Sequence, residues 1–205
     1  EALREGGVPL SVSSHILPEF REFERTSTTV ANAYVAPRVE GYLSRLRSDS
    51  PARRYRVMGS SGGTLPLAQA IREPVLTVLS GPAGGVVGAL DWARRCGFSN
   101  VLTFDMGGTS TDVSLVPGAP LQTREGSVGG VPIAIPLMDI HTVGAGGGSI
   151  VRLDAGGAIR VGPESAGADP GPIAYGRGGT DVTVTDAHVF LGRLPGQLLL
   201  AGNAR

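Results

Sequence analysis

Two aspartates flank a short run of glycines and hydroxyl residues at positions 105–112, Asp-Met-Gly-Gly-Thr-Ser-Thr-Asp. Glycines let the backbone approach an anion closely, and successive N–H groups can hold it. Carboxylates repel phosphate, so Asp105 and Asp112 suit such a site only if a divalent cation mediates or one of them positions a nucleophile. The pattern predicts a Mg-nucleotide phosphate site. The residues expected to contact phosphate oxygens are Gly107, Gly108, Thr109, Ser110 and Thr111.

A second interpretation of residues 105–112 needs no ligand. The run lies between two apolar stretches, 100–104 and 113–116, which are expected to be strands. Gly, Asp and Thr all favour tight turns for reasons of backbone geometry. From spacing alone, a plain hairpin turn and a phosphate loop therefore remain equally open.

The composition excludes several classes of function. With 41% hydrophobic and 18% charged residues, the chain has the make-up of a soluble globular protein. Its 18 basic and 18 acidic residues balance, which argues against nucleic acid or an anionic membrane as the main partner. All the basic residues are Arg, so a Walker-type phosphate loop and Schiff-base chemistry, which both need Lys, are excluded. The apolar runs are too short to cross a bilayer, and a cytoplasmic location is expected.

Two helices are predicted near the start of the chain, after a strand and loop that end at about Pro18. The first is an amphipathic helix from Glu19 to about Tyr34, and its apolar positions are Phe20, Phe23, Val30 and Tyr34. Pro37 is expected to end it, because Pro is favourable only in the first turn of a helix. The second helix runs to about Arg47, and its expected buried residues are Val39, Tyr42, Leu43 and Leu46.

The rest of the chain alternates between short strands and helices, which predicts an α/β fold with a mixed sheet and flanking helices. Strands are expected at 55–58, 75–79, 100–104, 113–116, 131–135 and near 140, helices at 67–71, 81–95 and 185–191 (capped by Thr185), and a hairpin at 150–161. Glycine inside a helix costs up to ~1 kcal/mol, so the glycines of helix 81–95 suggest close approach to another segment. The long Pro/Gly loop 162–179 is typical of a functional or disordered loop.

Asp139 and His141 form a further candidate site, because on one strand they would face the same side. A catalytic or substrate-binding role and a structural hydrogen bond both remain open for them. The glycine run 144–148 is no dinucleotide fingerprint, since position 149 is Ser. Gly146 and Gly147 could contact a substrate or an anion beside the phosphate site, or they could serve tight backbone packing.

Four further segments accompany the loop in a fixed order, and together with it they carry a family resemblance. They are residues 23–30, 80–85, 141–150 and 162–187. In this order the chain resembles the hydantoinase A/5-oxoprolinase family over nearly its whole length. The loop itself is similar to a phosphate motif of the actin, sugar-kinase and heat-shock-chaperone ATPases. The resemblance implies an incomplete actin-like (ribonuclease H-like) ATPase fold.

The resemblance also implies chemistry. Family members open a cyclic amide, such as 5-oxoproline or an N-substituted hydantoin, by phosphorylating the amide oxygen with ATP. The same fold serves as a subunit of ATP-dependent ketone carboxylases, which is the second alternative. The implied cofactors are ATP and Mg²⁺, and the carboxylate of Asp105 is expected to bind the metal. Asp105, Asp112 and His141 are the catalytic candidates. Asp139, Gly146 and Gly147 are candidate substrate contacts. A hydantoinase B-like partner subunit or fused domain is also implied.

The resemblance divides the chain into two incomplete lobes. Residues 1–95 correspond to the remainder of a first lobe that ends in a connecting helix, and residues 96–205 to the beginning of a second lobe with the phosphate loop. A first phosphate loop and a later adenosine segment are not found in the 205 residues. We therefore expect half a nucleotide cleft, with weak ATP binding by this chain alone, and an inert fragment is the third alternative. Ser61 stands where the family usually has Asn, which puts a side-chain amide role there in doubt.

Overall fold

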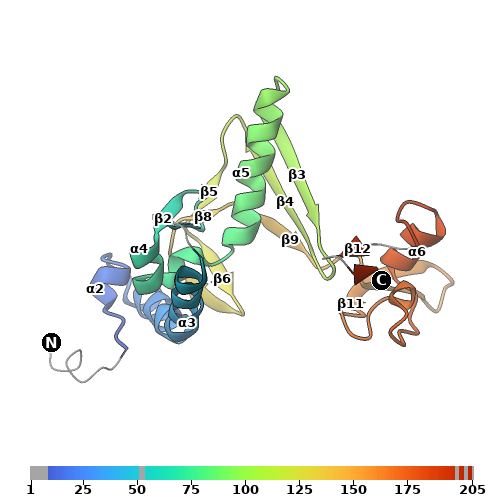
Figure 1. Ribbon diagram of the computed structural model, residues 1–205, viewed down its shortest axis with the longest axis horizontal. Helices are drawn as coiled ribbons and strands as arrows, with labels where there is room; N and C mark the ends of the chain where they lie inside the picture. The colour runs from blue at the N-terminus through green and yellow to red at the C-terminus, as the bar shows by residue number, and fades with distance from the viewer. Residues whose placement is uncertain (1–8, 51–53, 197–198, 201–202, 205) are drawn as a thin grey trace. The chain divides into compact units, whose positions relative to one another are not determined.

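The computed structural model describes residues 9–50, 54–196, 199–200 and 203–204 (Figure 1). Two compact units are present: unit 1 comprises Glu1–Val101 and Leu115–Ile140, and unit 2 comprises Leu102–Ser114 and His141–Arg205. Strands β3 (Asn100–Met106) and β4 (Thr111–Pro117) each begin in one unit and end in the other. Helices and small sheets alternate along the chain, so the α/β prediction is confirmed.

Unit 1 contains most of the helices. Its elements are α2 (Ser13–Ile16), α3 (Glu22–Asp49), β1 (Arg56–Met58), β2 (Thr64–Pro66), α4 (Leu67–Arg72), the 3-10 helix η1 (Pro74–Thr77), α5 (Ser80–Arg95), β5 (Gln122–Thr123), β6 (Gly126–Val128), β7 (Val131–Ile133) and β8 (Leu137–Met138). The strands pair antiparallel as β1–β2, β5–β8 and β6–β7. Among these, β1, α4, α5 and β7 match predicted elements, but the strand expected at 75–79 is wrong. Pro74 starts a 3-10 turn there and Leu79 adopts a left-handed conformation, which interrupts an extended strand.

Helix α3 is continuous, so the break predicted at Pro37 is wrong. Pro37 and Ala33, four residues earlier, are both exposed. The carbonyl that loses its intrahelical partner can therefore be satisfied by water. Of the strand and loop predicted up to about Pro18, residues 1–8 lie outside the described residues, and the short helix α2 occupies Ser13–Ile16 in the remainder.

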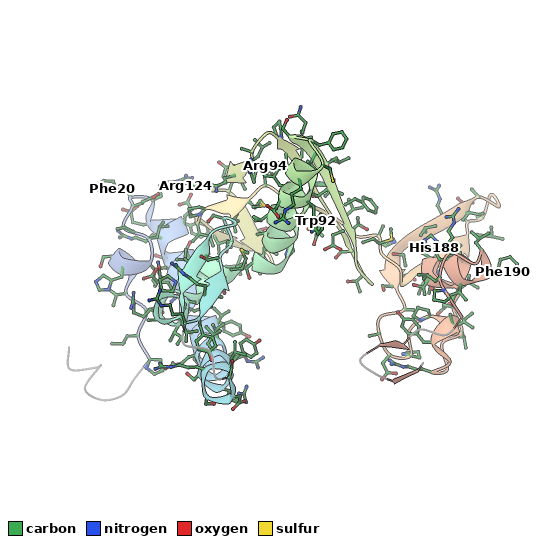
Figure 2. All side chains as sticks on the ribbon, turned by 45° about the horizontal axis from the view of Figure 1, so that its top comes forward. Phe20, Trp92, Arg94, Arg124, His188 and Phe190 are labelled. Carbon is green, nitrogen blue, oxygen red and sulfur yellow. The ribbon has the colours of Figure 1, made fainter. Side chains whose placement is uncertain are left out.

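The buried face of α3 is polar, which the apolar spacing did not indicate. Thr28 and Asn32 are fully buried, whereas Phe23 and Tyr34 are 72% and 81% exposed. Phe20, just before the helix, is 90% exposed (Figure 2). Of the apolar positions predicted to be buried on the second half of the helix, Leu43 is buried, but Tyr42 and Leu46 are exposed.

Asn32 joins α3 to the segment after α4. Its amide oxygen accepts the N–H of Val75 at 3.1 Å, and its amide nitrogen donates to the carbonyl of Arg72 at 3.2 Å and to the hydroxyl of Ser11 at 2.9 Å. Thr28 accepts the N–H of Ala134 at 3.0 Å, close to β7. These bonds satisfy backbone groups that would otherwise be buried without partners.

Unit 1 has two apolar clusters. In the first, α5 packs with Ala83, Val86 and Leu90 against Val101 of β3 and Val116 of β4 (Figure 1). The second gathers Val75 with Ile133, Ile135 and Leu137, next to Ile16 and Ala31. On α5, Arg94 donates to the carbonyl of Gly118 at 2.9 Å (Figure 2). These contacts hold the outer ends of β3 and β4 on the helix.

The close approach predicted from the glycines of α5 is not found at Gly81, Gly84 or Gly88, where an added Cβ would make at most an ordinary van der Waals contact. A Cβ on Gly84 would lie 3.6 Å from Cγ of Met58, but one on Gly81 or Gly88 would meet nothing within 4 Å. Helix α5 itself begins and ends close to the predicted bounds.

Unit 2 is built on strands and a short helix. Its remaining elements are β9 (His141–Val143), β10 (Ser149–Leu153), β11 (Ile159–Ser165), the 3-10 helix η2 (Ile173–Tyr175), α6 (Val184–Phe190), β12 (Leu199–Leu200) and β13 (Asn203–Ala204). β10 and β11 form the predicted hairpin, and β4 pairs antiparallel with β9. Helix α6 contacts β10 and η2.

Helix α6 begins one residue before the predicted cap. Thr183, not Thr185, is the N-cap, because Asp186 lies at the third helical position and completes a capping box with Thr183. Thr185 instead lies inside the first turn. At the other end, Phe190 is 90% exposed (Figure 2).

Candidate phosphate loop

Residues 107–110 form the turn between β3 and β4, and we call them the phosphate loop. The N–H of Gly107 donates to the carbonyl of Ser110 at 2.8 Å, which closes the turn. Gly107, Gly108 and Thr109 are exposed, and Ser110 is half-buried. The predicted hairpin turn is confirmed and its outer face is open, while phosphate binding by this turn stays a prediction.

The rear of the phosphate loop is held by a second glycine segment, residues 146–148, which we call the glycine strap. The N–H of Gly147 donates to the carbonyl of Gly107 at 2.9 Å, and that of Gly148 to the carbonyl of Gly108 at 2.7 Å. The hydroxyl of buried Thr111 donates to the carbonyl of Ala145. The carbonyls of Gly107 and Gly108 thus face the strap rather than an incoming anion.

The front of the phosphate loop keeps its donors available. Within the described part of the chain, the N–H groups of Gly108, Thr109 and Ser110 make no hydrogen bond. Their neighbouring carbonyls at 107 and 108 are bonded behind them, so the peptide dipoles of this turn are fixed. Successive N–H groups in such a turn are an anion-binding arrangement.

Gly108 has no reason within the protein to be glycine. A Cβ at this position would meet nothing within 4 Å, and its φ lies outside the left-handed region. At Gly107 the same Cβ would lie 3.3 Å from the carbonyl oxygen of Ser110, a tight contact. Close approach of a ligand explains a glycine at 108 where packing does not.

The two flanking aspartates have different surroundings. Asp105 is exposed near the end of β3, and its carboxylate makes no hydrogen bond or ion pair with any described residue. Asp112, on β4, accepts a hydrogen bond from the hydroxyl of Thr142 at 2.7 Å. Asp112 is therefore oriented by the sheet, whereas Asp105 keeps all its oxygen lone pairs for solvent or a cation.

His141 is not brought to the face of Asp112. On β9 it pairs with Val113, while Thr142 pairs with Asp112. Neighbouring strand residues point to opposite faces of a sheet, so His141 and Asp112 project to opposite sides. The prediction that Asp139 and His141 share a strand is wrong, since β8 ends at Met138 and β9 begins at His141.

Gly146 and Gly147 lie in the backbone layer behind the phosphate loop. Gly146 is buried, and the N–H and the carbonyl of Gly147 are both hydrogen-bonded, to Gly107 and Thr185. Of the two alternatives considered from the sequence, the contacts favour backbone packing. Sequence reasoning gave no role here to buried Ser149, whose hydroxyl accepts the N–H of Gly146 at 2.9 Å, or to Thr142.

Asp186 was also missed as a part of this region. Its carboxylate accepts the N–H groups of Ala174 (2.7 Å), Thr183 (2.8 Å) and Ile173 (3.3 Å), and the hydroxyl of Thr183 (2.8 Å). Burial by itself would raise the pKa of Asp186, but the hydrogen bonds from Ala174 and Thr183 outweigh it and place the pKa below its usual value. The Thr-x-x-Asp capping pattern was the available signal.

Two negative findings apply to the described residues. No three His, Cys, Asp or Glu side chains among them gather as ligands for a metal ion. Nor does any helix in the described ranges have the length and hydrophobicity needed to cross a membrane.

Known proteins are similar to this chain over most of its length. The caprolactamase subunit alpha of Pseudomonas jessenii is 40% identical over 93% of this chain and 28% of its own length. The crystal structure of ATP-dependent caprolactamase from that organism matches 98% of this chain and 30% of its own, with 37% identity and a TM-score of 0.76.

Two further relatives act on different substrates. The 5-oxoprolinase of Saccharomyces cerevisiae is 41% identical over 90% of this chain and 14% of its own length. The nucleotide-free structure of acetone carboxylase, from work on ATP-dependent acetone carboxylation, matches 94% of this chain and 28% of its own, with 34% identity and a TM-score of 0.72. The chain thus spans less than a third of the length of each of these relatives.

The family model described as hydantoinase/oxoprolinase matches residues 25–205, which include the phosphate loop, the glycine strap and α6. The expected fold and resemblance are both confirmed, and the chain belongs to the hydantoinase/oxoprolinase family.

Proposed function

We propose that this chain is the phosphate-binding part of a longer ATP-dependent enzyme that hydrolyses a cyclic amide. The single observation that carries the proposal is the phosphate loop: its carbonyls are bonded behind it, its outer N–H groups have no partner among the described residues, and Gly108 has open space where a side chain would be. Membership of the hydantoinase/oxoprolinase family supports the amide substrate.

The residues present fit a Mg-nucleotide. Backbone N–H groups and the hydroxyls of Thr109 and Ser110 suit phosphate oxygens, and Mg²⁺ prefers oxygen ligands such as the carboxylate of Asp105. Asp105 would hold the cation, directly or through water, while the loop would hold the phosphates. When bound, Mg-ATP would supply the phosphoryl group that activates the amide carbonyl.

The chain's own residues would fix where that chemistry happens. The loop N–H groups would orient the terminal phosphate, because electrostatic positioning dominates phosphoryl transfer. Asp112, held by Thr142, would orient the loop or accept a proton near it. Thr111 would act through its bond to Ala145, which fixes the start of β4, rather than by contacting phosphate. His141, on the opposite face, remains a candidate for contact with another part of the enzyme.

A ketone carboxylase subunit is the second candidate function. The similarity to acetone carboxylase, at 34% identity and a TM-score of 0.72, favours it. The ATP chemistry at the loop would be the same, and the phosphorylated oxygen would belong to a ketone enolate. For either function we propose a hydantoinase B-like partner, since one relative is named as the alpha subunit of its enzyme.

ADP release separates these functions. The full-length protein with its partner subunit would be incubated with ATP and Mg²⁺, and with 5-oxoproline, N-methylhydantoin, caprolactam, or acetone plus bicarbonate. Stimulation by a ring amide supports the amidase, and stimulation only by acetone with bicarbonate supports the carboxylase. Nucleotide binding without stimulation by any of them would reject both substrate classes. No nucleotide binding at all would reject the phosphate-loop assignment itself.

A further inference from the structure

The glycine strap and the N-terminal turn of α6 form two successive backbone layers behind the phosphate loop. We infer that Gly146 and Gly148 of the strap, together with Asp186 of α6, are positioning residues that set the geometry of the loop for nucleotide binding. The inference rests on the proposed function, because it concerns how the loop would be held for phosphate.

Gly147 and Gly148 of the strap are bonded on both sides. In front, the N–H groups of Gly147 and Gly148 donate to the carbonyls of the phosphate loop at 2.9 and 2.7 Å. Behind, the carbonyl of Gly147 accepts the N–H of Thr185 at 2.7 Å, and that of Gly148 accepts the N–H of Ala166 at 2.8 Å. A displacement of α6 would therefore be passed to the loop through a single layer of backbone.

The strap tolerates no side chain at the positions that face the loop. A Cβ on Gly146 would lie 2.7 Å from the carbonyl carbon of Gly108 and 2.8 Å from the carbonyl oxygen of Gly107. A Cβ on Gly148 would lie 2.9 Å from the carbonyl oxygen of Gly108. The neighbours are backbone atoms, which cannot rotate away as a flexible side chain would. Any substitution here must move the loop or the strap.

Gly144, on the same segment, provides a matched contrast. A Cβ at this position would meet nothing within 4 Å, and its φ is outside the left-handed region. Alanine at 144 should therefore leave the loop in place, whereas alanine at 146 should displace it.

Asp186 fixes the rear layer. Its carboxylate ties the N–H groups of Ile173 and Ala174 in η2 to the buried N-cap Thr183. Thr183 also forms a β-bridge with Ile150 at the start of β10. Thr185, whose N–H donates to the carbonyl of Gly147 in the strap, lies between Thr183 and Asp186 in the chain. Loss of the carboxylate frees η2 and the first turn of α6 together.

Asp154 is the matched control for Asp186. Its carboxylate also accepts backbone N–H groups, from Gly156 and Ala158 at 3.0 Å, and pairs with Arg160 at 2.9 Å. These contacts all lie within the β10–β11 hairpin turn. Asp154 thus shares the chemistry of Asp186, but within the described residues its carboxylate contacts the hairpin alone and neither η2 nor α6.

The first test compares Gly146→Ala with Gly144→Ala in the full-length protein. The KM for ATP, the KM for the ring substrate and kcat would be measured with Mg²⁺ present. A misplacement on the order of 1 Å can cost up to about 100-fold, so we expect the KM for ATP to rise by at least about 10-fold in Gly146→Ala, with the KM for the ring substrate unchanged. Gly144→Ala should match wild type. A purely structural defect would lower kcat through loss of active protein and leave both KM values alone, which would overturn the inference.

The second test uses Asp186→Asn and Asp154→Asn, which avoids a steric clash and applies even if Gly146→Ala fails to fold. We expect a higher KM for ATP in Asp186→Asn and wild-type kinetics in Asp154→Asn. Equal kinetics in the two variants would overturn the inference while the proposed function stands. If wild-type protein neither binds nor hydrolyses ATP, the proposed function itself fails. That result comes from wild type alone and is therefore distinct from any difference between the variants.

Discussion

The N–H of Gly148 donates to the carbonyl oxygen of Gly108 at 2.7 Å, so a glycine from the segment after β9 holds the turn between β3 and β4 from behind. This bond, with its neighbour from Gly147 to Gly107, explains how the loop can present N–H groups outward. A turn whose carbonyls were free could rotate its peptide planes and offer oxygen instead of N–H to an anion. The bonds to the strap stabilise one orientation.

Gly108→Ala should separate ligand binding from folding. Since a Cβ at 108 meets no protein atom within 4 Å, we expect the free energy of unfolding to change by about 0.5 kcal/mol or less. Nucleotide affinity of the full-length protein should fall, because the new methyl group stands where phosphate would approach. Calorimetric titration with ATP and Mg²⁺, beside thermal unfolding, checks both parts. Unchanged affinity would mean that ligand does not approach at Gly108.

Asn32→Ala should destabilise unit 1. The substitution leaves the buried N–H of Val75 and the carbonyl of Arg72 without their partner in the described structure. An unsatisfied buried polar group costs about 1–3 kcal/mol, so we expect a loss of about 2–4 kcal/mol. Denaturant unfolding of the variant and of wild type measures the difference.

Thr29→Ala is the control for Asn32→Ala on the same helix. The hydroxyl of Thr29 donates only to the carbonyl of Arg25, one turn earlier, at 2.7 Å. We expect a change of about 0.5 kcal/mol or less. Equal losses in the two variants would show that the buried amide of Asn32 has no special role.

The stability contributed by Asp186 should depend on pH. Its pKa in the folded chain lies below the ordinary value of 3.8, so the folded state favours the ionised carboxylate. The contribution is complete above the unfolded pKa and is lost as pH falls through the folded pKa. Wild type should therefore unfold at a higher temperature than Asp186→Asn above about pH 5, and the gap should close as pH falls below 3.8.

Thermal unfolding of wild type and Asp186→Asn across pH 2–7 measures this gap. The pKa of Asp154 is also lowered, mainly by the N–H of Ala158 and then by Arg160, so Asp154→Asn should behave in the same direction. A gap that stays constant with pH would show that the carboxylate charge of Asp186 contributes nothing to stability.

The turn between β3 and β4 could be predicted because its signal is local. Gly107 and Gly108 interrupt two apolar strands, and a turn between paired strands follows directly from that pattern. The hairpin β10–β11 and helix α5 were predictable for the same reason. In each of these, the residues that decide the structure are neighbours in sequence.

The buried face of α3 could not be predicted from hydrophobic spacing. That method assumes that apolar residues face the core, but the side chains of buried Thr28 and Asn32 bond backbone groups of Ala134, just after β7, and of the segment after α4. Those partners lie far away in the sequence. The sequence likewise does not decide whether the glycine strap contacts a ligand or packs against backbone. The carbonyls that it bonds, those of Gly107 and Gly108, belong to the turn between β3 and β4.

The cap of α6 could have been predicted more accurately. Thr183 and Asp186 have the spacing of a capping box, whereas Thr185, the predicted cap, directly precedes Asp186. The capping box requires the acidic residue three positions after the cap, and only Thr183 satisfies that spacing. Because α6 is capped by Thr183, Thr185 lies in its first turn, where its N–H donates to the carbonyl of Gly147 in the strap.

The most direct test of the phosphate loop is ATP turnover by the Asp105→Asn variant of the full-length enzyme. The carboxylate of Asp105 makes no hydrogen bond or ion pair with a described residue, so the fold should stay intact while the Mg²⁺ ligand is lost. Asp91→Asn, an exposed site on α5 paired with Arg95, is the control. We predict that Asp105→Asn abolishes ADP release with an unchanged thermal unfolding midpoint, and that Asp91→Asn turns over as wild type does. Wild-type turnover by Asp105→Asn would contradict the assignment of residues 105–112 as the Mg-nucleotide site.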